Sequence, residues 1–207
     1  MSADHFAGRC PRERDRDVTP DVGDQVTDAE LVARFRRDPE LFTLVHDRYF
    51  RDVYRYVAGR LGVHMAEDIV AETFCVAFGK RDRFHPERGS LRSWLFGIAT
   101  NLVAGHRRKE ARRYQSLART GAEPVTGGHE DRVVSLVAAE RMRPQLARAL
   151  AALSRGERDV VLLVALSQLS YEEVAQALGI SPGTVGSRLS RARRKLHDAI
   201  DQEDFDG

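Results

Sequence analysis

One segment near the C-terminus carries the side chains best suited to binding a polyanion. Positions 181–196 hold five basic residues and no acidic residue. Arginine can donate paired hydrogen bonds to guanine edges, and basic side chains neutralise phosphates, so this composition predicts a helix that reads DNA. The alternative is an αα-hairpin with a solvated basic face. The candidate DNA contacts on this helix are Thr184, Ser187, Arg188, Ser190, Arg191, Arg194 and Lys195.

The residues before this segment place it in a helix-turn-helix. Ser170 and Glu173 form a capping box, which predicts the start of a first helix. Gly179 suits the left-handed residue that commonly ends a helix. Ser181 can then cap a second helix, and Pro182 fits its first position, where a missing N–H costs nothing. A capped helix, a glycine turn and a second capped helix together predict a helix-turn-helix.

A second basic cluster follows aromatic residues in the first half of the chain. Residues 86–119 include eight basic and two acidic residues, and a long helix is predicted over about 90–113. Phe84 and Trp94 lie near its start. Bases stack on aromatic rings while cations neutralise the backbone, so this pattern suits strand-separated nucleic acid. The alternative is that Trp94 belongs to the core and the arginines form a solvated helix end.

Helical periodicity accounts for the rest of the chain. Apolar residues recur at helical spacing, and no stretch alternates β-branched with polar residues. A helix over about 66–80, for example, has an apolar side made of Ile69, Val70, Phe74, Ala77 and Phe78. We therefore predict an all-α fold of two small helical domains joined by a flexible linker. The predicted order is a disordered leader (1–23), a first domain (24–116), an acidic linker (117–140), a second domain (141–200) and an acidic tail (201–207).

Composition argues against several other classes of protein. The formal net charge of the 207 residues is only +2, but basic and acidic residues are segregated, and local fields act on a partner even when the total is small. No apolar run approaches the ~20 residues of a membrane helix, so we expect a cytoplasmic protein without membrane insertion. Cys10 and Cys75 lack the spacing of a zinc site, and we expect Cys75 to be a small buried residue. The seven histidines are scattered without a catalytic motif, so we expect no enzyme activity, no metal and no cofactor.

Motifs from both halves of the chain point to one family when they are taken together. They are AEDIVAETFCVAF (66–78), RGSLRSWLFGIATNLV followed by HRR (88–108), and SYEEVAQALGISPGTVGSRLSRARRKL (170–196). In this order they resemble the extracytoplasmic-function (ECF) sigma factors of bacterial RNA polymerase, over about residues 25–200. The resemblance implies an alternative sigma factor that binds core RNA polymerase and promoter DNA and directs promoter-specific initiation. A cognate anti-sigma factor is a common further partner in that family.

The resemblance also implies a role for each domain. The first domain would dock on the polymerase β′ clamp helices through Asp68 and Glu72, and would recognise and melt the −10 element. The second domain would read the −35 element and rest on the β flap. Asn101 matches the position that helps to hold a flipped-out base, and extruding a base costs a few kcal/mol that stacking can offset. The implied −10 residues are Phe84, Arg88, Ser90, Trp94, Asn101, Arg107, Arg108 and Arg112.

Three positions depart from the pattern of that family. Ala71 stands where glutamine is common, so one polymerase contact would be missing. Gly186 stands where a basic residue is common, and Ser190 where a larger side chain is common, so we expect an atypical −35 preference. The alternative function is a stand-alone helix-turn-helix regulator that binds duplex DNA without polymerase, although such a protein has no use for the first domain. A protein-interaction adaptor would show no dependence on DNA.

Overall fold

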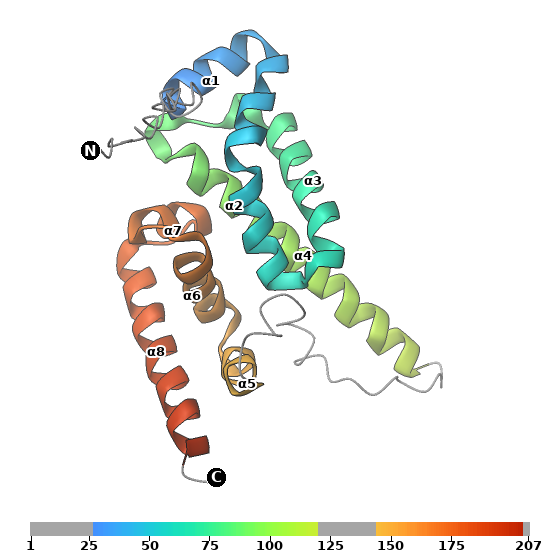
Figure 1. Ribbon diagram of the computed structural model, residues 1–207, viewed down its shortest axis with the longest axis vertical. Coiled ribbons are helices and arrows are strands. Elements are labelled where there is room, and N and C mark those ends of the chain that lie inside the picture. Colours follow the sequence, from blue (N-terminus) through green and yellow to red (C-terminus); the bar gives the residue numbers. More distant parts are fainter. Residues whose placement is uncertain (1–26, 120–143, 205–207) are drawn as a thin grey trace, which may run out of the picture.

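The computed structural model describes residues 27–119 and 144–204. Within these ranges the chain is helical and has no strand, which confirms the all-α prediction. The N-terminal bundle comprises α1 (Asp28–Arg37), α2 (Thr43–Leu61), α3 (Val63–Gly79) and α4 (Leu91–Arg119), with short 3₁₀ turns η2 (Pro39–Phe42), η3 (Arg81–Arg83) and η4 (Pro86–Arg88). The C-terminal bundle comprises α5 (Pro144–Ala152), α6 (Arg155–Ser167), α7 (Tyr171–Leu178) and α8 (Pro182–Asp204) (Figure 1).

Two long helices run further than the sequence indicated. Helix α4 was predicted to end near residue 113 but continues to Arg119. Residues 114–119 contain no glycine or proline that would interrupt the helix. Helix α8 continues to Asp204, into the predicted acidic tail. The predicted leader, most of the predicted linker and the last three residues lie outside the described ranges. In the described part of the chain, no helix combines the length and apolar character that crossing a membrane requires.

Local hydrogen bonds explain why three of the helices begin where they do. Each starts with a complete capping box, in which a hydroxyl accepts from the third backbone N–H and a glutamate accepts from the capping N–H. The three pairs are Thr27 with Glu30, Ser154 with Glu157 and Ser170 with Glu173. Gly179 ends α7 at φ +63°, which favours glycine, and the Thr184 N–H donates to Ser181 Oγ at 3.2 Å at the start of α8. The predicted helix-turn-helix is therefore present.

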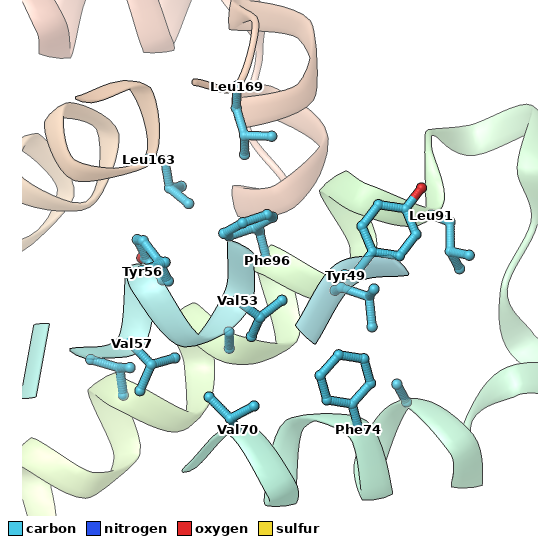
Figure 2. Close-up of a cluster of buried hydrophobic side chains, with 14 of the residues drawn as sticks. Tyr49, Val53, Tyr56, Val57, Val70, Phe74, Leu91, Phe96, Leu163 and Leu169 are labelled. Carbon is cyan, nitrogen blue, oxygen red and sulfur yellow. The ribbon is translucent and has the colours of Figure 1, made fainter. Parts of the chain in front are cut away.

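The N-terminal bundle is organised around α2, α3 and α4. Val53, Val57 and Val70 are completely buried between these helices (Figure 2). On α4, Leu91 and Leu95 are buried as predicted, while Ile98 and Leu102 are only half-buried. Other α4 side chains, Phe96, Ala99 and Val103, are also completely buried. Helix α4 is therefore covered on more of its circumference than an amphipathic surface helix would be.

The C-terminal bundle provides this additional cover. Helix α7 packs against α4, and α6 packs against α2. Leu163 and Leu169 lie over Phe96 and Tyr56, so buried residues from both bundles form one continuous apolar cluster (Figure 2). A smaller cluster joins α5 to α8. The two bundles thus pack against each other as well as folding around their own helices.

The outer side of α3 differs from two predictions. Cys75 was expected to be buried but is exposed, and Phe78 was expected on the apolar side but is 40% exposed. Helix α3 is packed by α2 and α4 on one side only, where Ile69, Val70 and Phe74 are buried. An apolar residue at the edge of that stripe therefore remains partly in solvent, and its periodicity alone does not reveal this.

Candidate nucleic-acid interface

The predicted DNA-reading helix is α8, and its two sides differ as expected. Val185, Leu189 and Ala192 are buried. The predicted DNA contacts are spread along the other side, where Thr184 and Arg188 are half-buried and the following are exposed: Ser187, Ser190, Arg191, Arg194 and Lys195. The structure therefore brings all seven predicted residues onto the outer surface of one helix. Arg193, which the sequence analysis did not single out, is exposed among them.

The basic residues of α8 fall into two groups because of α6. Lys195 Nζ donates to Glu157 Oε2 at 2.8 Å, and Arg191 Nε lies 3.6 Å from Glu157 Oε1. The Arg188 guanidinium lies beside Gly156, where a Cβ would be 2.9 Å from Nη1. The side chains of Arg188, Arg191 and Lys195 therefore lie against the start of α6. Ser187, Ser190 and Arg194 are exposed and take no part in these contacts.

Glu157 is a functional candidate that the sequence analysis treated only as a capping residue. Its carboxylate accepts from the Ser154 N–H at 3.0 Å, and its side chain is 6% exposed. The hydrogen bond from Lys195, supported by those from Ser154, lowers the pKa of Glu157 to about 2 despite the opposing effect of burial. Glu157 is therefore a fixed anion that holds two basic side chains of α8, the predicted DNA-reading helix. Its capping box gave no sign of this contact, because Lys195 is 38 residues away.

The acidic residues predicted to bind polymerase lie on the exposed side of α3. Asp68 and Glu72 are both exposed and one helical turn apart. Ala71 and Phe78 are exposed on the same helix, and the Arg81 guanidinium lies 4.4 Å from the centre of the Phe78 ring. This side of α3 therefore offers two carboxylates next to an apolar surface, a composition suited to a protein partner.

The loop before α4 forms a pocket of about 180 Å³. It is lined by Arg83, Phe84, His85, Arg88, Gly89, Ser90, Ser93, Trp94 and Gln176. The Phe84 and Trp94 rings are 5.1 Å apart, but Phe84 is 4% exposed, so Trp94 is the ring with the greater exposed surface. The structure thus brings four of the predicted −10 residues to one pocket: Phe84, Arg88, Ser90 and Trp94.

The remaining predicted −10 residues lie further along α4. Asn101 is exposed but is seven residues beyond Trp94, about 10 Å along the helix, and does not line the pocket. Arg108 and Arg112 are exposed. Arg107 instead turns toward α2, where its Nη2 donates to the Arg60 carbonyl at 2.6 Å. Burial and the nearby Arg60 lower the pKa of Arg107 to about 10, so it remains a cation at neutral pH.

One side of the pocket comes from the C-terminal bundle, which the sequence analysis did not anticipate. Ser93 Oγ donates to Gln176 Oε1 of α7 at 3.0 Å. Ser90 Oγ donates to Glu173 Oε1 at 3.2 Å, and Arg92 Nη1 lies 3.8 Å from Glu173 Oε2. The polar side chains of α7 therefore bind the same loop and helix start that the sequence analysis assigned to the −10 strand.

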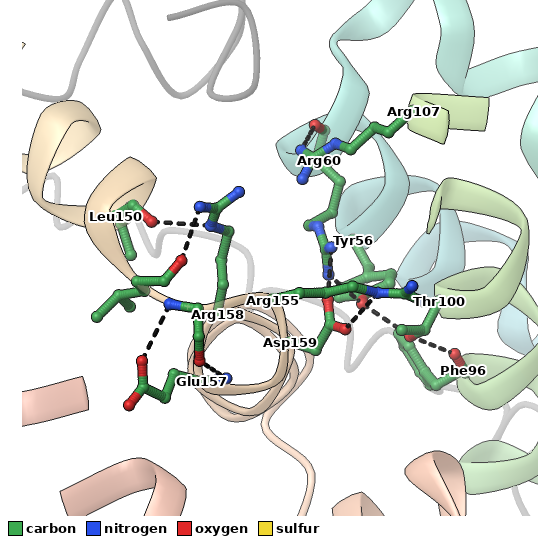
Figure 3. A network of polar contacts seen from close by, with 12 residues as sticks. Tyr56, Arg60, Phe96, Thr100, Arg107, Leu150, Arg155, Glu157, Arg158 and Asp159 are labelled. Carbon is green, nitrogen blue, oxygen red and sulfur yellow. Dashed lines mark hydrogen bonds and ion pairs between the residues drawn. The ribbon is translucent and has the colours of Figure 1, made fainter. Parts of the chain in front are cut away.

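A buried polar network also joins the two bundles (Figure 3). Arg60 of α2 is 2% exposed, and its Nη2 donates to Asp159 Oδ1 of α6 at 2.6 Å. Its Nη1 donates to the Tyr56 hydroxyl at 2.7 Å, and that hydroxyl lies 2.8 Å from Thr100 Oγ1. Arg155 Nε lies 3.7 Å from the second Asp159 oxygen. The charge of Arg60 is thus balanced by a carboxylate from the other bundle.

Comparison with known families accounts for both bundles. The Sigma-70 region 2 model matches residues 45–113, and the Sigma-70 region 4 model matches residues 143–196. The ECF RNA polymerase sigma factor SigC of Mycobacterium tuberculosis is 34% identical over 159 residues, which cover 76% of this chain and 82% of SigC. This chain belongs to the ECF sigma factor family. The ECF sigma-E factor of Escherichia coli is 29% identical over 186 residues, covering 86% of this chain and 97% of that protein.

Solved structures support the same assignment for this ECF sigma factor. CnrH in complex with the cytosolic domain of CnrY has a TM-score of 0.60 and 27% identity, covering 84% of this chain and 97% of that one. The sigma factor RpoE in complex with the anti-sigma factor NepR from Bartonella quintana has a TM-score of 0.52 and 28% identity, covering 81% of this chain and 98% of that one. The predicted family is therefore confirmed.

The family assignment decides between the functions considered above. An ECF sigma factor is an alternative sigma factor that binds core RNA polymerase and promoter DNA and directs transcription initiation. A stand-alone regulator is not supported, because the region 2 match covers most of the N-terminal bundle. Within the residues that the structure describes, no group of three His, Cys, Asp or Glu side chains is placed to hold a metal ion.

Proposed function

We propose that this ECF sigma factor divides promoter recognition between its two bundles. The pocket next to Trp94 would receive a base of the melted −10 strand, and the outer surface of α8 would read the −35 duplex. The observation that carries this proposal is the separation of two different surfaces. One is an aromatic and polar pocket suited to an unpaired base, and the other is a basic helix suited to the major groove.

The −10 proposal rests on what the pocket offers to a flipped-out base. The Trp94 ring can stack on the base, and the Ser90 hydroxyl can hydrogen-bond to the edge of the base. Arg88 lines the same pocket and is exposed, so its guanidinium can bind a phosphate of the DNA strand. Base stacking on an aromatic ring is worth about 1–3 kcal/mol, which is comparable with the cost of extruding a base. Asn101, Arg108 and Arg112 would bind the strand or duplex further along α4.

The −35 proposal rests on the division among the α8 side chains. Glu157 already holds Arg191 and Lys195 near α6, so these two would contact the DNA from fixed positions. Ser187, Ser190 and Arg194 are placed to reach the groove without that constraint. Gly186 and Ser190 are smaller than the residues usual in the family, which leaves fewer side-chain atoms to contact base edges. We expect the discrimination between −35 sequences to be correspondingly weak.

The polymerase proposal assigns α3 to the β′ clamp helices. Asp68 and Glu72 would face basic groups of the partner, and the exposed part of Phe78 would add apolar contact area. The C-terminal bundle would rest on the β flap, and residues 117–140 would link the two domains across the polymerase.

One solved neighbour is CnrH in complex with the cytosolic domain of CnrY, and another is RpoE in complex with the anti-sigma factor NepR. A cognate anti-sigma factor is therefore proposed as a further partner of this protein. We place the protein in the cytoplasm, with its polymerase, and assign it no catalytic reaction.

Reconstitution with core RNA polymerase tests this assignment. The purified chain should bind the core enzyme and start transcripts at specific promoters, which can be found by sequencing the transcripts made from genomic DNA. Asp68→Arg should abolish binding to the core enzyme, because it places a cation opposite basic partner groups. Asp47→Arg makes the same charge change on α2, where the side chain is 76% exposed, and serves as the control. Equal binding by both variants would remove Asp68 from the interface.

A further inference from the structure

The pocket loop, residues 84–90, leads into α4 and carries several of the residues that line the proposed −10 pocket. Phe84 at its start and Leu91 directly after it are buried, but residues 85–88 are exposed. An exposed segment gains little from packing, so its conformation depends on what holds its two ends. Helix α1 lies against this loop (Figure 1) and is bonded to both of its ends.

Asp28, the first residue of α1, holds the end of the pocket loop. Its Oδ2 accepts from the Leu91 backbone N–H at 3.0 Å, although the two residues are 63 positions apart. Leu91 is the first residue of α4, where backbone N–H groups have no partner inside the helix. Asp28 therefore caps α4 from another element, and its negative charge is favourable at this helix end. Trp94 lies about one turn further along α4, so the cap also orients the ring that would stack on a base.

The Asp28 carboxylate is itself fixed by side chains of α2. The Tyr49 hydroxyl donates to Asp28 Oδ1 at 2.6 Å, and Arg48 Nη1 lies 3.7 Å from the same oxygen. Burial, together with the Asp28 carboxylate, raises the pKa of the Tyr49 hydroxyl. The hydroxyl therefore stays protonated at neutral pH and remains a donor. Both oxygens of Asp28 are thus engaged, which restricts the orientation of its carboxylate.

The start of the pocket loop is held from the other end of α1. Arg36 Nη2 donates to the Phe84 carbonyl, and the Phe84 ring packs 5.1 Å from that of Trp94. Asp28 and Arg36 are separated by about 12 Å along the helix axis. Val32, midway between them, is buried, so this part of α1 is packed against the bundle. Helix α1 is therefore a rigid connection between the two ends of the loop.

We propose that α1 sets the shape of the −10 pocket, with Asp28 and Arg36 acting as positioning residues that do not themselves contact DNA. This inference rests on the proposed −10 function of the pocket. A loop that is already held in its binding conformation does not have to be ordered when a base enters, so it binds more tightly and discriminates more strongly between bases. Releasing either end of the loop should therefore reduce the discrimination between −10 sequences.

Two neighbouring arginines supply the first matched pair of variants. Arg36→Ala releases the Phe84 carbonyl, whereas Arg37→Ala removes the same charge from the next residue of α1. Both arginines are exposed. The two substitutions therefore have similar effects on helix propensity and on the long-range attraction of DNA. Only Arg36→Ala changes the hold on the loop.

Asp28 supplies the second pair of variants. Asp28→Ala leaves the Leu91 N–H and the Tyr49 hydroxyl without their shared acceptor. Asp28→Asn keeps an oxygen that can accept from the Leu91 N–H, and its amide can donate to the Tyr49 hydroxyl. The asparagine variant should therefore retain the loop conformation although it has lost the charge. It serves as the conservative rescue.

The test measures which −10 sequences each variant accepts in the holoenzyme. Each variant is combined with core RNA polymerase and with templates that carry one promoter, found by transcript sequencing, whose −10 region is randomised. At the most selective position, the yield ratio between the best and the worst base should fall about tenfold in Arg36→Ala and Asp28→Ala. Arg37→Ala and Asp28→Asn should keep the wild-type ratio. A general loss of folded protein would lower all yields together and leave the ratio unchanged.

Trp94 gives a second readout that needs no polymerase, because it is the only tryptophan in the chain. Acrylamide should quench its fluorescence more efficiently in Arg36→Ala and Asp28→Ala than in their two controls. Circular dichroism of each variant checks that the helices are intact.

The proposal is overturned if the two arginine variants have the same −10 discrimination, or if the two Asp28 variants do. Equal Trp94 quenching within each pair would also overturn it, because the loop would then be held by something other than α1. A wild type that starts no specific transcripts would instead refute the proposed function. That failure is distinguishable, because the differences in quenching would remain.

Discussion

The Arg60–Asp159 ion pair allows the contact between the bundles to be tested energetically. Asp159→Ala would remove the only carboxylate that is within bonding distance of Arg60 among the described residues. Arg60 would keep its hydrogen bond to Tyr56 but would be a 2% exposed cation without a counter-charge. Removing one partner of a buried pair typically costs about 3–5 kcal/mol. Unlike a charge in the centre of a single domain, however, Arg60 can regain water if the bundles separate.

The possibility that the bundles separate determines the expected result. If separation costs less than about 3–5 kcal/mol, Asp159→Ala should separate the bundles while both remain folded. We therefore expect a larger radius of gyration by small-angle X-ray scattering, with the helical circular dichroism signal retained. Arg155→Ala is the control, because it removes the other partner of the same carboxylate, and Arg155 is 59% exposed. An exposed pair contributes about 0–1 kcal/mol, so this variant should remain compact.

Urea denaturation completes the assay. Asp159→Ala should lower the midpoint of unfolding well below that of Arg155→Ala, or should produce separate transitions for the two bundles. Replacing both partners by apolar residues, as in Arg60→Met with Asp159→Leu, should recover much of the loss, because no charge is left buried. The reasoning is refuted if Asp159→Ala matches the wild type in both radius of gyration and urea midpoint.

Three further predictions concern the C-terminal bundle. Because the pKa of Glu157 is lowered, its stabilising effect is complete above its ordinary value of 4.5 and is lost as the pH falls toward about 2; thermal melting should show this loss in the wild type but not in Glu157→Gln. Gly179→Ala should cost about 1 kcal/mol in urea unfolding, because φ is +63° at this position. Arg191→Ala should weaken binding to the protein's own −35 element by about 1–3 kcal/mol if the side chain reads bases; a uniform loss across sequences, with a shallower salt dependence, would instead assign it to phosphate.

Local signals in the sequence were sufficient for the helix-turn-helix and the helix starts. The capping box of Ser170 and Glu173, and the left-handed Gly179, involve residues a few positions apart and depend on backbone geometry alone. They therefore keep their meaning whatever else the chain does. Asp68 and Glu72 were likewise correctly expected on the exposed side of a helix, since Ile69 and Val70 are buried.

Sequence periodicity was less informative about what covers each helix. Phe78 and Cys75 are exposed because α3 has neighbours on one side only, whereas Phe96 is buried beneath residues of the other bundle, which also packs on α4. A hydrophobic pattern shows that a residue is suited to burial, but not whether a partner surface is present. Arg107 illustrates the same limit, since its inward contact with the Arg60 carbonyl follows from the placement of α2.

The chain's composition, caps and motifs by themselves determined an all-α protein of the ECF sigma family with a helix-turn-helix near its C-terminus. Only the tertiary structure decided that Gln176 lines the pocket before α4 and that Asp159 neutralises Arg60, 99 residues away in the chain. Such pairs leave no local trace, because their geometry depends on how two separately capped bundles pack. The physical reason is that a hydrogen bond across a domain boundary is set by the fit of whole surfaces.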